Sequence, residues 1–337
     1  MENPLDNLFV PTRGGDAEKL AGSIIITGGA GFVASYLAER LLIDEQFSEI
    51  KKIYLIDNLV RTNSTRNIDH LLSNPRVQFI HGDISTFEYE DYFDPFSVSW
   101  IFHLAATRIN RCNERMFEGH QYIATGGARL IDWASRYTHI KLFFASSASV
   151  YQSPKRLPIE ETDNCSPRTI YGAGKLYTEN LIKSYNQLFG MDYVIHRFFS
   201  IYGVRMDNAG SYTEVIFNWL NQIKKGNKDI FVYGNPDEKI LDLVYVTDVI
   251  DAIILSMNSN NKTYNISTQV GITLTDLIAV IEKVTNTTLN RVFLKEDRID
   301  IEKARIGDVS KLKLDTNWEP KISIEEGIKK TWEWINE

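Results

Sequence analysis

Three tyrosines in this 337-residue chain are each followed four residues later by a lysine, a spacing that can set an ammonium group beside a phenol. The pairs are Tyr137 with Lys141, Tyr151 with Lys155, and Tyr171 with Lys175. Residues four apart share a face only on a helix, so the local sequence decides which pair can act together. Pro154 disfavours a helix across the second pair, and the first runs straight into a strand-like segment. Tyr171 instead opens YGAGKLYTENLIKSYNQLF, a long amphipathic segment, so its pair with Lys175 is the candidate.

An ammonium group beside a phenol favours use of the phenol as a base. A free phenol has a pKa of about 10, and each unit of downward shift corresponds to about 1.4 kcal/mol. The charge on Lys175 and a nearby oxidised nicotinamide would both stabilise the phenolate. Ser147 ends a predicted strand, where open α/β sheets hold ligands, and its hydroxyl could share the reacting proton. A lone serine at a strand end more often hydrogen-bonds to the backbone. Because Tyr171 and Lys175 are also present, we predict Tyr171, Lys175 and Ser147 as the catalytic residues.

A glycine-rich turn supplies a candidate cofactor site. The run TGGAGFVA (27–34) directly follows an apolar strand and opens a helix. Glycines let the backbone approach a pyrophosphate, which then sits at the helix N-terminus, where free N–H groups and the dipole favour negative charge. Asp57 ends the second predicted strand, where a carboxylate would accept ribose hydroxyls and repel a 2′-phosphate; this predicts NAD over NADP, although Arg61 nearby weakens the inference. The contacts predicted in these segments are Gly28, Gly31, Phe32, Val33, Asp57 and Asn58.

Short apolar runs alternate with longer helix-like segments from residue 23 onward. The runs are SIIIT (23–27), KIYLI (52–56), VQFIH (77–81), SWIFHLAA (99–106) and IKLFFASS (140–147). Apolar runs with helices between them are typical of parallel strands covered on both faces. We therefore predict an α/β protein with a Rossmann-like doubly wound parallel sheet. After about residue 200 the pattern weakens into shorter pieces, which indicates a smaller mixed α/β C-terminal substrate lobe.

These patterns suggest three parts of the chain. They are an N-terminal extension (1–22), an NAD-binding Rossmann-like domain (23–200) and a substrate-binding lobe (201–337), with the chain crossing between the lobes. Within the second part, one predicted helix face is formed by Ile123, Gly126, Gly127, Leu130, Ile131 and Ala134. The glycines on this face allow close helix packing, either inside the monomer or across a dimer interface.

Composition excludes several classes of protein. The 37 Lys and Arg against 44 Asp and Glu leave a formal charge of −7, and no basic stripe with interleaved aromatics is present, which argues against nucleic-acid binding. Cys112 and Cys165 are too few for a disulfide scaffold and match no metal-ligand spacing. No run reaches the about 18 apolar residues of a membrane span, and the first twenty residues lack the apolar core of a signal peptide. We therefore expect a cytoplasmic protein with neither a metal nor a membrane partner.

The order and spacing of these motifs resemble the NAD-dependent epimerase/dehydratase family of extended short-chain dehydrogenases/reductases, which act on nucleotide sugars. The resemblance covers roughly residues 23 to 335. The matching segments are TGGAGFVAS (27–35), YLIDN (54–58), HGDI (81–84), HLAA (103–106), SSASVY (146–151), YGAGK (171–175), RFFSIYG (197–203), LVYVTDV (243–249) and DVSKLK with WEP (308–320). The resemblance implies a catalytic triad of the serine, tyrosine and lysine above, and a homodimer paired through a four-helix bundle. It also implies that the cofactor is lined by Leu104, Ala105 and Ala106 and that its adenine is flanked by Asp83 and Ile84.

Departures from the family pattern narrow the activity. Family dehydratases carry Thr-Asp-Glu at the strand end, where the acids perform the elimination, whereas this chain has Ser147, Ala148 and Ser149. Decarboxylases often carry Glu at the position of Ser149, and some 3,5-epimerases carry Cys there. Excluding these activities leaves redox epimerisation or a one-way dehydrogenase or ketoreductase, and we favour an NAD-dependent nucleotide-sugar epimerase that acts at C4 through a transient 4-keto sugar. A nucleotide-sugar dehydrogenase or 4-ketoreductase is the alternative, a decarboxylase or dehydratase is less favoured, and a non-catalytic dinucleotide sensor is a remote alternative, because such relatives often lose the Tyr/Lys pair.

The resemblance implies a nucleotide-diphosphate sugar as substrate, but the family's usual phosphate clamp is incomplete. Ser200 stands where many relatives have Asn, Ile123 stands where a helix Asn is usual, and Leu241 replaces the Arg of the family's Arg-Asp motif. Arg298 matches the family's C-terminal arginine and offers one bidentate contact. Arg205, just after the Tyr-Gly turn in YGVRMD, is a candidate for another, with a solvated surface arginine as the alternative. The predicted substrate contacts are Ser147, Ser200, Arg205 and Arg298.

Overall fold

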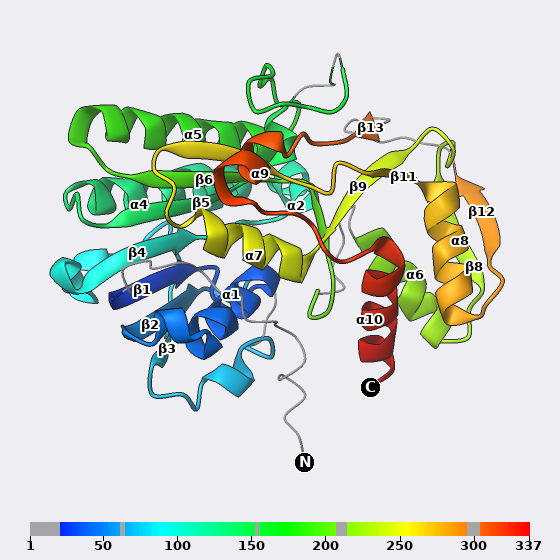
Figure 1. Cartoon of the computed structure of the whole chain (residues 1–337), viewed down its shortest axis with the longest axis horizontal. Helices are drawn as coiled ribbons and strands as arrows, with labels where there is room; N and C mark the ends of the chain where they lie inside the picture. Colours follow the sequence, from blue (N-terminus) through cyan, green and yellow to red (C-terminus); the bar gives the residue numbers. More distant parts are fainter. Residues whose placement is uncertain (1–20, 61–64, 152–153, 155, 207–213, 295–303) are drawn as a thin grey trace.

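A seven-stranded parallel sheet forms the centre of the protein (Figure 1). The computed structural model describes residues 21–60, 65–151, 154, 156–206, 214–294 and 304–337. The strands are β1 (Gly22–Thr27), β2 (Ile50–Asp57), β3 (Val77–His81), β4 (Val98–His103), β5 (Lys141–Ser147), β6 (Tyr193–Phe198) and β10 (Lys262–Ile266). Their order is β10-β6-β5-β4-β1-β2-β3, and every neighbouring pair is parallel. The predicted fold class is confirmed, and the strand order reverses between β1 and β4, where such sheets hold ligands.

Helices cover both faces of this sheet (Figure 1). On one face lie α1 (Phe32–Ile43) and α7 (Val246–Ser256), and on the other lie α4 (Gly126–Ser135) and α5 (Ile170–Phe189). Successive side chains of a strand point to opposite faces, so Ile24 and Ile26 pack with α1 and α7 while Ile25 packs with α4 and α5. Continuous apolar runs such as SIIIT are therefore buried on both sides, as the sequence predicts.

The glycine-bearing helix face packs inside the monomer. A Cβ added to Gly126 would lie 2.7 Å from the Ile84 side chain, and one added to Gly127 would lie 3.1 Å from Thr178 on α5. These contacts bring α4 close to α5 and to the loop after β3. Of the two arrangements that the sequence allowed for this stripe, the structure shows the intramolecular one.

Residues after position 200 form a second group of strands and helices. β7 (Ser200–Tyr202), β9 (Ile240–Tyr245), β11 (Gly271–Thr273) and β13 (Ala304–Arg305) make a four-stranded sheet, and β8 (Asp229–Tyr233) pairs with β12 (Asn290–Leu294). The helices here are α6 (Glu214–Lys224), α8 (Leu274–Thr285) and α10 (Ile324–Asn336), whereas α9 (Ser310–Thr316) packs against α7 and β10. Because β10 and α7 belong to the central layers, segments after residue 200 also build the sheet that holds the site. The proposed boundary at residue 200 itself stays a prediction, and residues 1–20 of the extension lie outside the described residues.

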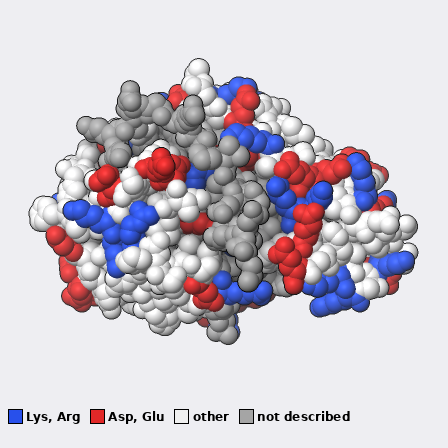
Figure 2. Space-filling view, turned by 60° about the horizontal axis from the view of Figure 1, so that its bottom comes forward, with Lys and Arg blue, Asp and Glu red and all other residues white. Residues whose placement is uncertain are grey.

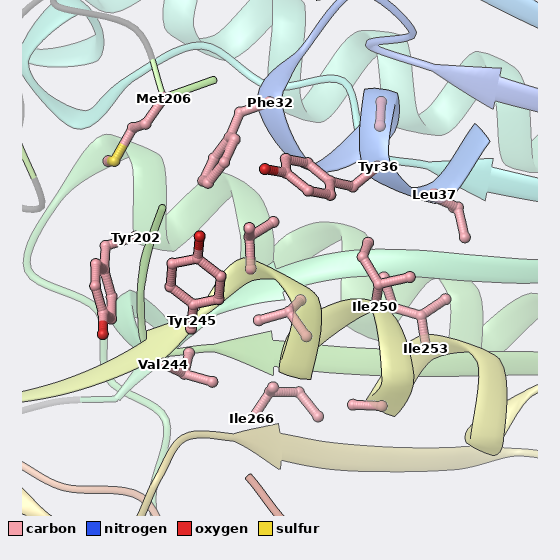
Figure 3. Packing of buried hydrophobic residues seen from close by; sticks show 14 of the residues in the cluster. Phe32, Tyr36, Leu37, Tyr202, Met206, Val244, Tyr245, Ile250, Ile253 and Ile266 are labelled. Atoms are coloured by element: carbon pink, nitrogen blue, oxygen red, sulfur yellow. The ribbon is translucent and has the colours of Figure 1, made fainter. Parts of the chain in front are cut away.

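A buried cluster fixes the start of α1 against the second half of the chain. Figure 3 shows Phe32 and Tyr36 of α1 facing Met206 and Tyr245, with Ile250 of α7 packed below. Tyr36 is fully buried, and Phe32 and Met206 are 8% and 6% exposed. Burying an aromatic side chain of this size contributes about 1.5–3 kcal/mol to the stability of the fold. This packing therefore holds the N-terminus of α1, directly after the glycine-rich turn, in place.

The surface mixes charges of both signs. On the face seen in Figure 2, basic and acidic side chains are interspersed and form no continuous basic track among the described residues. Several charges are paired, as in the contacts of Arg136 with Glu90 and Asp132 at 2.9 and 2.6 Å. In the described part of the chain, no helix combines the length and apolar character needed to cross a membrane. The cytoplasmic location expected from the sequence stays a prediction.

Candidate active site

A cavity of about 700 Å³ opens at the C-terminal edge of the central sheet, where the strand order reverses. It is lined by loops that follow β1, β2, β3, β4 and β5, and by the first turns of α1 and α5. Most of the predicted cofactor and catalytic residues therefore share one space. They are Gly28, Gly31, Phe32, Val33, Asp57, Asn58, Ile84, Leu104, Ala105, Ala106, Ser147, Tyr171 and Lys175.

The glycine-rich turn brings its backbone against the loop after β4. Gly28 has φ +70°, and a Cβ there would lie 2.8 Å from Cα of Ala105, so only glycine fits without strain. Gly31 is the N-cap residue of α1 and has no side chain to occupy the free N–H groups of the first turn. Its own N–H donates to the Gly28 carbonyl at 2.9 Å. The first turn of α1 thus faces the cavity with backbone donors, the arrangement that binds a pyrophosphate.

Asp57 and Asn58 form the wall beyond the end of β2. The Asp57 carboxylate accepts hydrogen bonds from the N–H of Ala30 at 3.1 Å and of Leu59 at 2.7 Å. The Asn58 amide donates to Asp83 at 2.9 Å. Asp83 itself does not appear in the cavity lining, whereas its neighbour Ile84 does. The cavity residues thus fit a dinucleotide, with glycine backbone for the pyrophosphate and a carboxylate for the ribose; Arg61 lies outside the described residues.

The pair that the sequence favoured does lie on a helix and in the cavity wall. Thr169 caps α5 by accepting from the N–H of Gly172 at 3.1 Å, which starts the helix directly before Tyr171. The Lys175 ammonium lies 5.8 Å from the centroid of the Tyr171 ring and donates to the carbonyl of Ala145 at 2.6 Å.

The first competing pair lacks this arrangement, and the second falls partly outside the described residues. Tyr137 follows the end of α4, and Lys141 starts β5, so no helix joins them. Tyr151 is buried and donates from its hydroxyl to Asn265 at 2.7 Å, and Lys155 lies outside the described residues. Within the described residues, Tyr171 and Lys175 thus share a helix and the cavity wall, and their catalytic role stays a prediction.

Lys175 is the buried cation of the site. Only 2% of it is exposed, and burial lowers the pKa of Lys175 from 10.5 to about 7, partly opposed by the negative charge of Glu179. Desolvation disfavours the charged form of an amine, which explains the direction. The ammonium therefore titrates near neutral pH, close to the phenol that it is expected to assist.

Replacing Lys175 by Met is expected to change how stability depends on pH. Between a folded pKa of about 7 and the ordinary value of 10.5, the unfolded wild type carries a proton that the folded protein lacks. The free energy of unfolding of the wild type therefore rises with pH across this window, by up to about 1.4 kcal/mol per pH unit, and the Met variant lacks that rise. Denaturant unfolding of both proteins across the window measures the difference. Parallel pH curves would contradict the lowered pKa of Lys175 in the folded protein.

Ser147 has two roles available to it. Its hydroxyl oxygen accepts from the N–H of Ser149 at 3.1 Å and so caps the short turn Ala148–Val150, as a strand-end serine usually does. It also lines the cavity beside Tyr171. Since the oxygen is the acceptor in the capping bond, the hydroxyl hydrogen can still be donated toward a ligand.

The predicted substrate contacts are less well supported. Arg205 pairs with the buried Glu39 at 2.6 Å, lies 4.5 Å from the Tyr36 ring centroid and does not appear in the cavity lining, so we do not carry it forward as a phosphate ligand. Ser200 starts β7 and is also missing from that lining, and Arg298 lies outside the described residues.

Three cations that the sequence reasoning missed lie in the cavity wall instead. They are Arg108, Arg111 and Arg115, at and around α2 (Ile109–Glu114). Arg111 and Arg115 both pair with Glu118, at 3.0 and 2.7 Å. A signal was present in the sequence, because the run TRINRCNER follows directly on HLAA.

Comparison with known proteins finds relatives that act on nucleotide sugars, among them epimerases and decarboxylases. Residues 25–331 match the profile of a family described as GDP-mannose 4,6 dehydratase. A Methanocaldococcus jannaschii protein, provisionally named as a UDP-glucose 4-epimerase, is 30% identical over 93% of this chain and 98% of its own. The crystal structure of the Thermotoga maritima UDP-glucose 4-epimerase with UDP-glucose superposes with a TM-score of 0.84, at 25% identity over 93% of this chain and 98% of that one. The Thermus thermophilus UDP-glucose 4-epimerase complex with NAD gives 0.82 at 26% identity, over 93% and 99% of the chains.

Proposed function

The chain belongs to the NAD-dependent epimerase/dehydratase family of extended short-chain dehydrogenases/reductases, and we propose that it epimerises a nucleotide-diphosphate sugar at C4. The observation that carries this proposal is the set of groups around the cavity. Ser147, Tyr171 and Lys175 line it together, while the next positions of the strand end are Ala148 and Ser149, which offer no carboxylate. Among the described lining residues the carboxylates are Asp57, beside the cofactor turn, and Glu114 on α2. The groups support oxidation and reduction at one carbon rather than elimination.

In this proposal Tyr171 moves the proton and its neighbours prepare it to do so. When bound, NAD supplies a hydride acceptor and donor at its nicotinamide ring. The Tyr171 phenolate takes the proton of the 4-hydroxyl, and Ser147 donates a hydrogen bond to the same oxygen. Lys175 stabilises the phenolate by its charge and fixes the helix by its bond to the Ala145 carbonyl. After the 4-keto sugar has rotated in the cavity and is reduced on its other face, Tyr171 returns the proton to the C4 oxygen, which completes the new hydroxyl.

The proposed substrate class is a nucleotide-diphosphate sugar, and UDP-glucose is the first member to test. Its support is the UDP-glucose in the Thermotoga maritima structure, which covers nearly the whole chain. The arginines of the cavity wall offer cationic groups in a chain that has Leu241 where the family has an arginine. Arg298 stays a proposed diphosphate contact.

The proposal includes a homodimer. Its support is a group of exposed apolar side chains on α5 and on α3 (Met116–His120), which packs against α5. Met116 and Phe117 on α3 are 62% and 74% exposed, Leu188 near the end of α5 is 73% exposed, and exposed apolar surface commonly marks interfaces. Light scattering on the purified protein is expected to give twice the mass of one chain. A mass of a single chain at all concentrations would contradict this part of the proposal.

Product analysis tests the reaction and the substrate together. The purified protein is incubated with UDP-, GDP-, dTDP- and CDP-sugars, the products are identified by NMR, and absorbance at the NADH band is followed. We expect one sugar pair to interconvert with no net change in that absorbance. Stoichiometric build-up or consumption of NADH would support the alternative, a nucleotide-sugar dehydrogenase or 4-ketoreductase, for which the same three residues would serve.

A further inference from the structure

We propose that Glu179 is a positioning residue which, through Ser146, holds the end of β5 and therefore Ser147 in place relative to Tyr171 and Lys175. The inference rests on the roles proposed above for those three residues. Glu179 does not appear in the cavity lining, so it acts through another group rather than on a ligand. Its side chain is fully buried on α5.

The helix binds two successive residues of β5 directly before Ser147. Glu179 lies one helical turn after Lys175, so both side chains emerge from the same face of α5. Lys175 donates to the carbonyl of Ala145 at 2.6 Å, and Ser146 donates from its hydroxyl to Oε1 of Glu179 at 2.5 Å. Successive side chains of a strand point to opposite faces, and the Ser146 hydroxyl is directed to the helix carboxylate, although both Ser146 and Ser147 contribute to the cavity lining. These two hydrogen bonds fix the position of the end of β5 relative to α5, the helix that carries Tyr171.

A buried arginine holds the carboxylate itself. Arg197 on β6 donates to both oxygens of Glu179, from Nε at 2.9 Å and from Nη2 at 2.7 Å. A bidentate pair of this kind fixes orientation as well as charge, which a single contact would not. Arg197 is held in turn, because its Nη1 donates to the Tyr151 hydroxyl at 2.8 Å and to the carbonyl of Glu161 at 3.0 Å. The position of Glu179 is therefore set by β6 as well as by its own helix.

This network predicts an effect on chemistry larger than its effect on binding. In the part of the chain that the structure describes, the Ser146 hydroxyl links the Glu179 carboxylate to the strand end, and Ser147 is the next residue. Near-attack geometry is sensitive, since a misplacement of about 1 Å costs about 100-fold in rate. The glycine turn and Asp57 lie on other strands, so loss of the Ser146 bond is expected to leave cofactor binding intact.

The test is Ser146→Ala, which removes this bond and keeps the Arg197–Glu179 pair. We expect kcat to fall about 10- to 100-fold, while KM for the sugar nucleotide and the NAD content change by less than about twofold. Ser146→Cys, which keeps a weak donor in a similar volume, is expected to lie between wild type and Ser146→Ala. The matched control is Lys183→Met, because Lys183 also contacts Glu179, at 3.4 Å, yet is half-buried and does not touch the strand; its kcat is expected to match the wild type.

The outcomes separate this inference from the proposed function. Wild-type kcat in Ser146→Ala, with or without a lower melting temperature, shows a merely structural bond and overturns the inference. If Tyr171→Phe in the same assay is inactive, the proposed function stands in that case. If Tyr171→Phe keeps full turnover, the proposed function fails whatever Ser146→Ala does.

Discussion

Tyr171→Phe is expected to lose about 10²- to 10⁴-fold in turnover while the purified protein still carries NAD, because the change removes only the hydroxyl that transfers the proton. The ring of Tyr171 and its neighbour Lys175 keep their places at the start of α5, so the cavity retains its shape. The measurement is kcat with the active sugar pair, together with the NAD released on denaturation.

Tyr177→Phe is the matched control for this variant. Tyr177 lies on the same helix and is 48% exposed, and it does not appear in the cavity lining, so the loss of its hydroxyl is expected to leave turnover unchanged. Equal activity of Tyr171→Phe and the wild type would contradict the proposed chemistry and favour a protein that senses the dinucleotide without transforming a sugar.

Gly172→Ala is expected to reduce turnover by about 100-fold through geometry alone. A Cβ at Gly172 would lie 2.2 Å from the carbonyl oxygen of Ser149, which is backbone and cannot turn aside. The first turn of α5 must then move away from the end of β5, and a displacement on the order of 1 Å separates Tyr171 from Ser147 enough for that loss. Overpacking of this kind also destabilises by about 1–3 kcal/mol, which thermal unfolding would detect.

Ala173→Gly controls for helix propensity at the adjacent position. Ala173 is exposed, and its change costs about 1 kcal/mol of helix stability without touching Ser149. Turnover close to the wild type is expected for this control. A Gly172→Ala protein that folds and turns over at the wild-type rate would show that the contact between helix and strand end does not govern the reaction.

Most of the central sheet can be predicted because its strands are apolar on both faces. β1, β3 and β5 both begin and end within one residue of the predicted runs. The fourth run ends early, since β4 stops at His103 and the chain then turns aside, with the N–H of Ala105 bonded to the Thr27 hydroxyl at 3.3 Å. Leu104, Ala105 and Ala106, which the predicted run included but β4 does not, line the cavity.

Two strands, β6 and β10, escape prediction because they bury polar groups. Arg197 in β6 is buried only because Glu179 pairs with it, and His196 beside it is bonded to Ser256 at 2.8 Å. In β10, Asn265 is buried against the Tyr151 hydroxyl, 114 residues away in the chain. Hydrophobic periodicity cannot reveal such strands, because the partners that satisfy the buried polar groups are distant in sequence.

The residues of the site also differ in whether local sequence or a distant partner determines their position. The pairing of Tyr171 with Lys175 depends on one local helix, and the sequence contains everything needed to predict it. The orientation of Arg205 depends on Glu39, which lies 166 residues earlier, and on a backbone with φ +67° at Arg205 itself. No local sequence pattern shows such a contact. The sequence therefore suggests Arg205 as a substrate contact, whereas the fold pairs it with Glu39.

The fate of the hydrogen at C4 is the most direct test of an epimerase that works through a 4-keto sugar. The purified protein, with its retained NAD, is given the active nucleotide sugar deuterated at C4, and the product is examined by NMR. We predict that both epimers keep deuterium at C4 and that no NADH accumulates, because the same hydride leaves and returns. Loss of the label to solvent, inversion at another carbon, or accumulation of NADH with a keto product would contradict this.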